Sequence, residues 1–262
     1  MEEKKAKELI SAFIREKNNL NYANLTDDNQ YLGWVADFNI NYNDQKMCLN
    51  LKEENDLFLL FVLALAWSRP GQWENAAYFV TYLKANNKDY PEYWLNNENI
   101  KHEIENRDKN ATEIINKVYN SDTRNKISFR KDIFDSIHIL AINWSEIKKE
   151  LENSSLKGDY VSFMNYLRGI NGLGVKSNRI YIKIPLILRE LRCQNIYDNI
   201  PGDLCCVPDE RVKKACSALD IKIPSMHKRD INSLIKVSTK IYNLFGDLYD
   251  LPLFAYEDID NY

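Results

Sequence analysis

Two helical patterns separated by a glycine-rich turn constrain this chain more than any other stretch. Apolar residues recur at helical spacing over 160–167, which predicts an amphipathic helix. A second apolar stripe at helical spacing follows over 180–191. Between the stripes lie Gly169, Gly172 and Gly174. Because glycine tolerates positive φ and leaves the backbone bare, the pattern predicts helix, tight hairpin and helix, with a kink or a broken turn at Pro185.

The hairpin is a candidate phosphate site. Its amides and the free N–H groups at the start of the second helix point outward, where an anion can approach them. A glycine-bearing turn between helices is also a common structural connection, so the turn alone leaves both interpretations open. Lys176 stands at the start of the second helix, where the positive end of the helix dipole favours a neutral amine. A neutral lysine is a nucleophile, which makes Lys176 a candidate catalytic residue.

A carboxylate follows the hairpin in the segment VPDERV. Pro208 suits the first turn of a helix and Asp209 suits its N-terminus, so this carboxylate is expected at a helix start, facing the hairpin. An aspartate in this position is commonly a simple helix cap. Its pairing with the hairpin lysine favours a catalytic role instead.

These residues resemble a known family. The hairpin GLGVKS with its lysine, followed by VPDERV with its aspartate, is similar to the helix-hairpin-helix DNA glycosylase superfamily, in its bifunctional, lysine-bearing branch. Within that branch the chain is most similar to the archaeal 8-oxoguanine DNA glycosylases, and the likeness covers most of its length. The local matches are Asn29-Gln30-Tyr31, Gly71-Gln72-Trp73-Glu74 with Phe79, Lys176 with 180–184, and Asp209 with Arg211-Val212.

The resemblance implies a base excision repair enzyme that acts on an oxidised purine in duplex DNA. The amine of Lys176 would attack the sugar C1′ and displace the base, and the Schiff base would then allow β-elimination of the 3′ phosphate. Asp209 would take the lysine proton and stabilise the cationic sugar. Gly172, Gly174 and Arg211 are the expected contacts to the DNA backbone.

The resemblance also implies a pocket for an extruded base. Gln30 would read the hydrogen-bonding edge of the base, and Trp73 would stack on its face. Without the resemblance, Gln30 is an ordinary polar residue and Trp73 a packing residue. The family has an acidic residue and a second tryptophan in its last helix, whereas all five tryptophans here precede the hairpin. The candidates for base binding at this end are Glu257, Asp258 and Tyr262.

Charge is distributed as a polyanion partner requires. The chain carries a net charge of −3 over its 262 residues. Residues 168–229, however, hold 12 Lys and Arg against 6 Asp and Glu, so positive charge gathers on the segment with the hairpin and Asp209. A solvated basic helix face is the alternative explanation.

Several other classes of protein are not expected. The longest apolar run, 57–67, is far shorter than the roughly 20 residues of a membrane span, and the charged N-terminus lacks the features of a secretory signal. Five scattered cysteines suggest neither a disulfide framework nor an iron–sulfur cluster, and three distant histidines suggest no metal site. We therefore expect a cytoplasmic monomer without cofactor or metal, associated with the nucleoid by its function.

Helical patterns dominate the chain, so the expected fold is all-α. Helices are expected at 2–17, 27–36, 53–67, 72–86, 129–140, 144–151, 158–168 and 229–246, with a last one after Pro252. Residues 38–42 alternate weakly and are expected to form an extended connector. We expect two lobes, 1–50 plus 200–262 and 51–199, with DNA lying in the cleft between them.

Two function classes remain open. The first is the bifunctional glycosylase and lyase, with another damaged base as a variant of it. The second is a DNA-binding module that uses the hairpin only to hold the backbone. The pair of Lys176 and Asp209 favours the enzyme, because phosphate binding requires neither residue, and a monofunctional glycosylase would normally lack the lysine.

Overall fold

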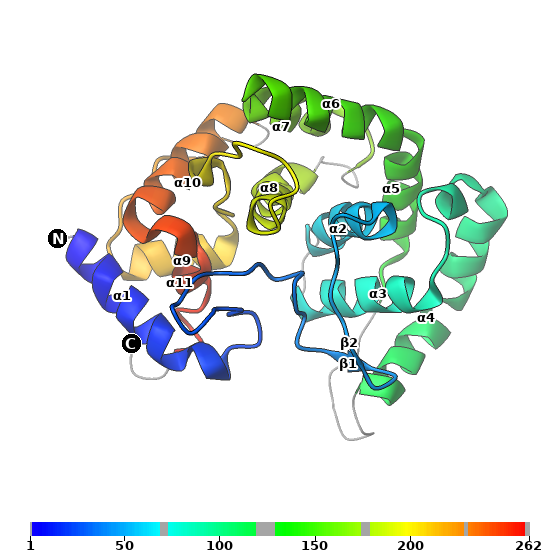
Figure 1. The fold of residues 1–262 in the computed structure, drawn as a ribbon, viewed down its shortest axis with the longest axis horizontal. Helices are drawn as coiled ribbons and strands as arrows, with labels where there is room; N and C mark the ends of the chain where they lie inside the picture. Colours follow the sequence, from blue (N-terminus) through cyan, green and yellow to red (C-terminus); the bar gives the residue numbers. More distant parts are fainter. Residues whose placement is uncertain (1, 69–72, 119–128, 174–178, 228–229, 260–262) are drawn as a thin grey trace. The chain divides into compact units, whose positions relative to one another are not determined.

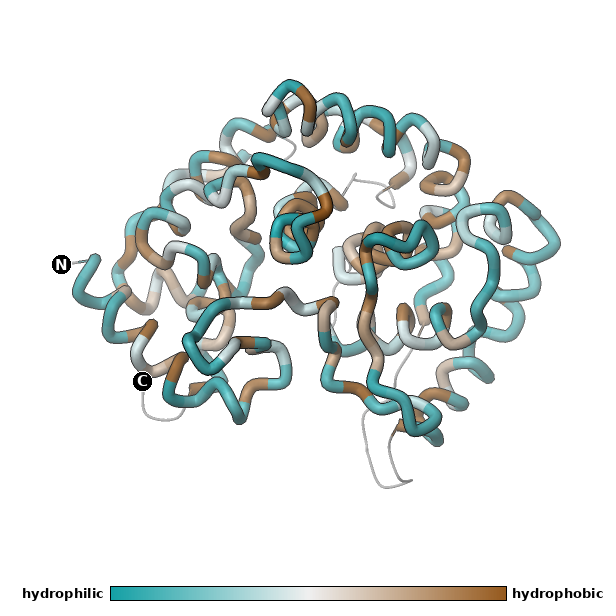
Figure 2. Tube along the Cα trace, in the orientation of Figure 1, coloured by the Kyte–Doolittle hydropathy of each residue, from teal (hydrophilic) through white to brown (hydrophobic). Residues whose placement is uncertain are grey.

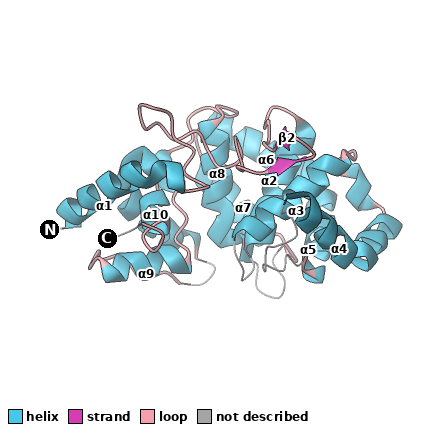
Figure 3. Ribbon diagram, turned by 90° about the horizontal axis from the view of Figure 1, so that it is seen from below, coloured by secondary structure: helices cyan, strands magenta, loops and turns pink. Residues whose placement is uncertain are grey.

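The computed structural model describes residues 2–68, 73–118, 129–173, 179–227 and 230–259. The fold is all-α, as expected: Figures 1 and 3 show helices throughout the described chain, with one short antiparallel ladder. That ladder pairs β1 (Asn41–Tyr42) with β2 (Gln45–Lys46). None of the helices in the described part of the chain combines the length and the apolar character that a membrane span requires.

The chain divides into two compact units. Unit 1 comprises residues 1–36 and 184–262, and unit 2 comprises residues 37–183. The sequence placed these boundaries near 50 and 200, whereas the units change over after 36 and 183. The second boundary lies earlier than expected because α8 (Ile184–Cys193), which follows the hairpin, belongs to unit 1. Its charged side chains bond to the N-terminal segment and to the C-terminal part of the chain.

Unit 2 is built around α2 (Glu54–Trp67), which is buried along its whole length from Asp56 onward. This helix is apolar on all sides, as its brown colour in Figure 2 shows, so every face requires a partner. It packs against α3 (Trp73–Asn86), α5 (Lys131–Ile142) and η3 (Arg179–Lys183). The remaining helices are η2 (Glu92–Leu95), α4 (Asn97–Val118), α6 (Trp144–Lys157) and α7 (Tyr160–Gly169).

The approach to the hairpin follows local sequence rules. Helix α6 ends at Gly158, whose φ of +66° belongs to the left-handed region that glycine tolerates. Asp159 then caps α7 by accepting a hydrogen bond from the Ser162 amide at 3.1 Å. The apolar stripe of α7 is buried, as its spacing predicts. After the hairpin, the 3₁₀ helix η3 passes into α8 at Ile184, so the break expected at Pro185 is present.

Unit 1 contains the two ends of the chain and α8. Its helices are α1 (Glu2–Glu16), η1 (Lys17–Asn19), η4 (Gly202–Leu204), α9 (Glu210–Ala218), α10 (Ile231–Phe245), η5 (Gly246–Leu248) and α11 (Leu251–Phe254). Helix α10 packs against α1 and η4, and α11 packs against α9 and α1. Helix α8 contacts η4, and all eight of its residues from 184 to 191 are buried.

One expected helix in unit 1 is wrong, and another is shorter than expected. Residues 27–36 form a turn and an extended segment, because Asn29 and Gly33 adopt φ of +63° and +98° and the Val35 amide bonds to Glu190. The last helix, α11, ends at Phe254. Glu257 and Asp258 therefore lie in the turns that follow it.

Candidate functional site

Asp209 is the N-cap of α9. Its Oδ1 accepts hydrogen bonds from the amides of Arg211 and Val212, both at 3.1 Å. A carboxylate at this position is stabilised by the free amides of the first turn and by the helix dipole. The sequence predicted a helix start here, and the structure has one. The same geometry satisfies the simpler interpretation, a helix cap.

The segment before Asp209 is tied to the core of unit 1. The amide of Val207 donates to Oδ1 of buried Asp250 at 2.8 Å, and the amide of Cys206 donates to Ser238 Oγ at 3.0 Å. The Asp209 amide then donates to the Val207 carbonyl at 3.0 Å, which closes a tight turn. Buried side chains distant in sequence therefore hold the backbone that leads into the cap.

Arg211 and Asp258 bind each other. The sequence assigned Arg211 to the DNA backbone and Asp258 to the base pocket, yet their side chains form an ion pair and are 27% and 40% exposed. Tyr22 donates a hydrogen bond to the same carboxylate oxygen at 2.6 Å, and the guanidinium lies 4.4 Å from the centre of the Phe254 ring. The two side chains therefore bind each other in the described structure.

The other candidates in unit 1 lie on its surface. Gln30 is exposed. Its backbone amide donates to Thr26 Oγ1 at 3.0 Å, and its backbone carbonyl accepts from the Thr26 backbone amide at 2.9 Å. Glu257 is exposed next to Asp258. Of the candidates, the structure brings together Asp209, Arg211 and Asp258. Asp209 caps the helix that carries Arg211, and Arg211 pairs with Asp258.

Two candidates in unit 2 are among the described residues. Trp73 is the first residue of α3 and is buried. Gly172 follows α7 with a φ of +85°, and a Cβ at this position would stand 2.4 Å from Ile139 Cδ1. Lys176, Gly174 and Tyr262 lie outside the described residues. Among the residues that are described, no group of three or more His, Cys, Asp or Glu side chains is arranged to hold a metal ion.

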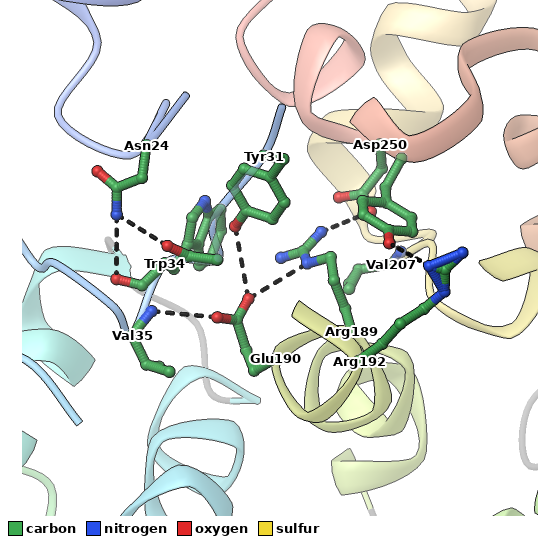
Figure 4. A network of polar contacts seen from close by, with 11 residues as sticks. Asn24, Tyr31, Trp34, Val35, Arg189, Glu190, Arg192, Val207 and Asp250 are labelled. Carbon is green, nitrogen blue, oxygen red and sulfur yellow. Dashed lines mark hydrogen bonds and ion pairs between the residues drawn. The ribbon is translucent and has the colours of Figure 1, made fainter. Parts of the chain in front are cut away.

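A buried charge network in unit 1 was not predicted from the sequence (Figure 4). Arg189 Nη1 donates a hydrogen bond to Asp250 Oδ1 at 2.9 Å. Arg189 Nε lies 3.4 Å from Glu190 Oε1. Glu190 also accepts from the Val35 amide at 3.1 Å and from the Tyr31 hydroxyl at 3.4 Å. Burial raises the pKa of Glu190 and of Asp250, and Arg189 offsets part of each rise.

The sequence carries only a weak signal for this network. Arg189 and Glu190 stand side by side inside the apolar run IPLILRELR, and a charged pair in such a run is ordinarily assigned to the solvent-facing side of an amphipathic helix. The structure buries both residues completely. Complete burial of charged residues requires partners, and those partners come from segments remote in the sequence.

Comparison with protein-family models, with curated proteins and with solved structures gave no match for this chain.

Proposed function

We propose that this chain is a base excision repair DNA glycosylase with AP lyase activity, which removes an oxidised purine such as 8-oxoguanine from duplex DNA. The observation that carries the proposal is the position of Asp209. Its carboxylate stands at the N-terminus of α9, held by two amides in the segment VPDERV, where the lysine–aspartate chemistry needs an ionised group. The helix before the hairpin and the positive φ of Gly172 also support the proposal.

In this mechanism Lys176 is the nucleophile. Its amine lone pair forms a bond to the sugar C1′ while the glycosidic bond breaks, and the base leaves with the bonding electrons and gains a proton. Asp209 accepts the proton that the attacking amine loses and stabilises the positive charge on the sugar. Ring opening gives the Schiff base. Loss of the C2′ proton then breaks the C3′–O bond and releases the 3′ phosphate.

The proposed partner is double-stranded DNA that contains a damaged base. The hairpin with Gly172 and Gly174 and the side chain of Arg211 would bind phosphates, so affinity should fall with added salt. Gln30, Trp73, Glu257, Asp258 and Tyr262 are the proposed base-binding residues. The protein would act as a monomer in the cytoplasm, at the nucleoid, without a cofactor.

Borohydride trapping on a duplex with a single 8-oxoguanine tests the proposal. The wild-type protein should form a covalent adduct and cleave the strand, and Lys176→Gln should abolish both while leaving lesion binding largely intact, because the lysine's role is covalent. Duplexes with other damaged bases, assayed in parallel, identify the preferred lesion. Lack of an adduct on every lesion and on a preformed abasic site would contradict an enzymatic function.

Lys183 supplies the control, since it is the competing amine of the same segment. Its Nζ lies 3.2 Å from the centre of the Trp67 ring, and the residue is only 4% exposed. Lys183→Gln should retain trapping, with thermal unfolding used to confirm that the variant folds. If Lys183→Gln alone abolished trapping, the assignment of the hairpin lysine would be wrong. If neither replacement mattered and duplex binding persisted, the non-catalytic DNA-binding module would be the better interpretation.

A further inference from the structure

Two adjacent residues of α8 bind two other segments of unit 1, and a third segment is attached through Asp250. Glu190 bonds to residues 31–35 of the N-terminal segment, and Arg189 bonds to Asp250 near the C-terminus. Asp250 in turn accepts a hydrogen bond from the backbone amide of Val207, two residues before Asp209. Figure 4 shows Arg189 between Glu190 and Asp250, with Val207 beside the latter.

The link from Asp250 to Asp209 is short. Val207 and Asp250 are both buried, and the Val207 backbone amide donates a hydrogen bond to the side-chain Oδ1 of Asp250 at 2.8 Å. Pro208 restricts the next φ angle, and the Asp209 amide closes the turn onto the Val207 carbonyl at 3.0 Å. The charge of Asp209 adds to the rise in the pKa of Asp250, so the two carboxylates are close enough to interact.

Stability alone does not account for the buried charges. Burial of an ion pair costs desolvation energy that its attraction roughly offsets, and apolar residues of similar volume often serve a core equally well. A directional hydrogen bond, in contrast, determines where a backbone amide lies. The network joins the segment that carries Gln30 to the start of α9. Apolar contacts would hold these two segments less specifically.

We propose that Asp250, oriented by Arg189, is a positioning residue that sets the Asp209 carboxylate by holding the Val207 amide. This inference rests on the proposed function, because it assigns Asp250 a role in base release. Asp250 itself is buried and does not touch the substrate. A displaced Asp209 would slow base release steeply, since misplacement of a catalytic group by about 1 Å can cost roughly a hundredfold in rate.

Two substitutions remove the same charge and differ in whether an acceptor oxygen remains at position 250. Asp250→Asn keeps an acceptor oxygen for the Val207 amide, whereas Asp250→Leu removes it. Arg189 retains Glu190 as its partner in both variants. Single-turnover base release should therefore fall by about tenfold or more in Asp250→Leu and by no more than about threefold in Asp250→Asn. Trapping on a preformed abasic site should survive in both, because it requires the lysine and no base release.

Amide hydrogen exchange gives a readout that does not depend on activity. In Asp250→Leu the amides of Arg211 and Val212, which Asp209 caps, should exchange about tenfold faster than in Asp250→Asn. The amides of Asn232 and Ser233, which Asp230 caps on α10 of the same unit, should be unchanged. If thermal unfolding shows that leucine overfills the site, Asp250→Ala provides the same comparison.

The outcomes separate the two proposals. Equal base release and equal exchange in the leucine and asparagine variants would overturn the positioning role, as would equal acceleration at both caps. If the wild-type protein neither released a base nor formed an adduct, the proposed function would fail. The exchange measurement alone would then decide whether Asp250 sets the position of Asp209.

Discussion

The guanidinium of Arg211 pairs with the carboxylate of Asp258, 47 residues further along the chain. In the proposed function both residues bind DNA, and in the described structure they satisfy each other instead. Asp258→Asn should weaken the pair, free Arg211 for a phosphate and raise the affinity for duplex DNA. Arg211→Ala should lower this affinity and reduce the magnitude of the salt dependence by about one unit of slope. Fluorescence anisotropy over a salt series measures both effects.

Lys213 is a matched control for Arg211. It lies on the same helix, its side chain is also 27% exposed, and it pairs with Glu210. Lys213→Ala should leave the salt slope closer to that of the wild-type protein. Equal changes for the two cations would mean that α9 contributes only a general positive charge.

Asp209→Asn should slow base release by orders of magnitude and leave the fold intact, because asparagine caps a helix about as well as aspartate but cannot accept a proton. Duplex affinity should be unchanged or higher, since a negative charge near phosphates is lost. Asp230→Asn is the control, as Asp230 caps α10 with the same pair of amide bonds. If both variants released the base at the wild-type rate, Asp209 would be a cap and nothing more.

Gly172→Ala should weaken binding to intact and damaged duplexes alike, because its φ of +85° shapes the proposed phosphate-binding hairpin. Gly158→Ala is the control within unit 2, since Gly158 also has positive φ and a Cβ there would meet nothing within 4 Å. Gly158→Ala should cost about 1 kcal/mol of stability from its positive φ. Gly172→Ala should cost more, because a Cβ there would also stand 2.4 Å from Ile139 Cδ1. Weaker binding of damaged DNA alone would mean that the hairpin reads the lesion.

Gly33→Ala should destabilise unit 1. A Cβ there would stand 2.6 Å from Glu190 Oε2, the buried oxygen that accepts the Val35 amide. Backbone strain at φ of +98° and a weakened hydrogen bond together should cost about 2–4 kcal/mol in urea unfolding. Gly246→Ala, in the same unit and with open space around it, should cost less. Equal losses would show that the approach of Glu190 to residue 33 is unimportant.

Stability should depend on Glu54 at acid pH. Its hydrogen bond with Lys148 lowers the pKa of Glu54 below the ordinary 4.5, and the Trp144 indole N–H adds to this effect. A lowered folded-state pKa contributes stability that is present above pH 4.5 and is lost as the pH falls through the folded-state value. Glu54→Gln should therefore be less stable than wild type near pH 7, by up to about 0.5 kcal/mol because the group is half exposed, and equal to it near pH 3.

Urea unfolding at a series of pH values tests this difference. Glu146→Gln is the control, because Glu146 pairs with Lys149 on the surface of its own helix, and both side chains are more than half exposed. Its difference from wild type should be the smaller one across the series. A constant difference between Glu54→Gln and wild type from pH 7 to pH 3 would exclude the proposed linkage.

Local rules determined much of the architecture from the sequence. The apolar spacing of α7, the continuous apolar run of α2 and the break near Pro185 act over a few residues, and the structure contains each of them. Asp209 belongs to this class as well, since a cap bonds to amides two and three residues ahead. An all-α fold follows from such patterns because helix periodicity and capping are local interactions.

Tertiary structure decided what depends on distant partners. Residues 27–36 are not a helix, because Val35 bonds to Glu190, 155 residues away, and this bond outweighs local propensity. Buried Arg189 has Asp250, 61 residues away, as one of its charge partners. The periodicity of a sequence shows which residues are apolar. It does not show which distant charged residue will pair with a buried charge. Most of the helices could therefore be predicted from the sequence, whereas the network that holds Val207 and the pairing of Arg211 with Asp258 required the folded chain.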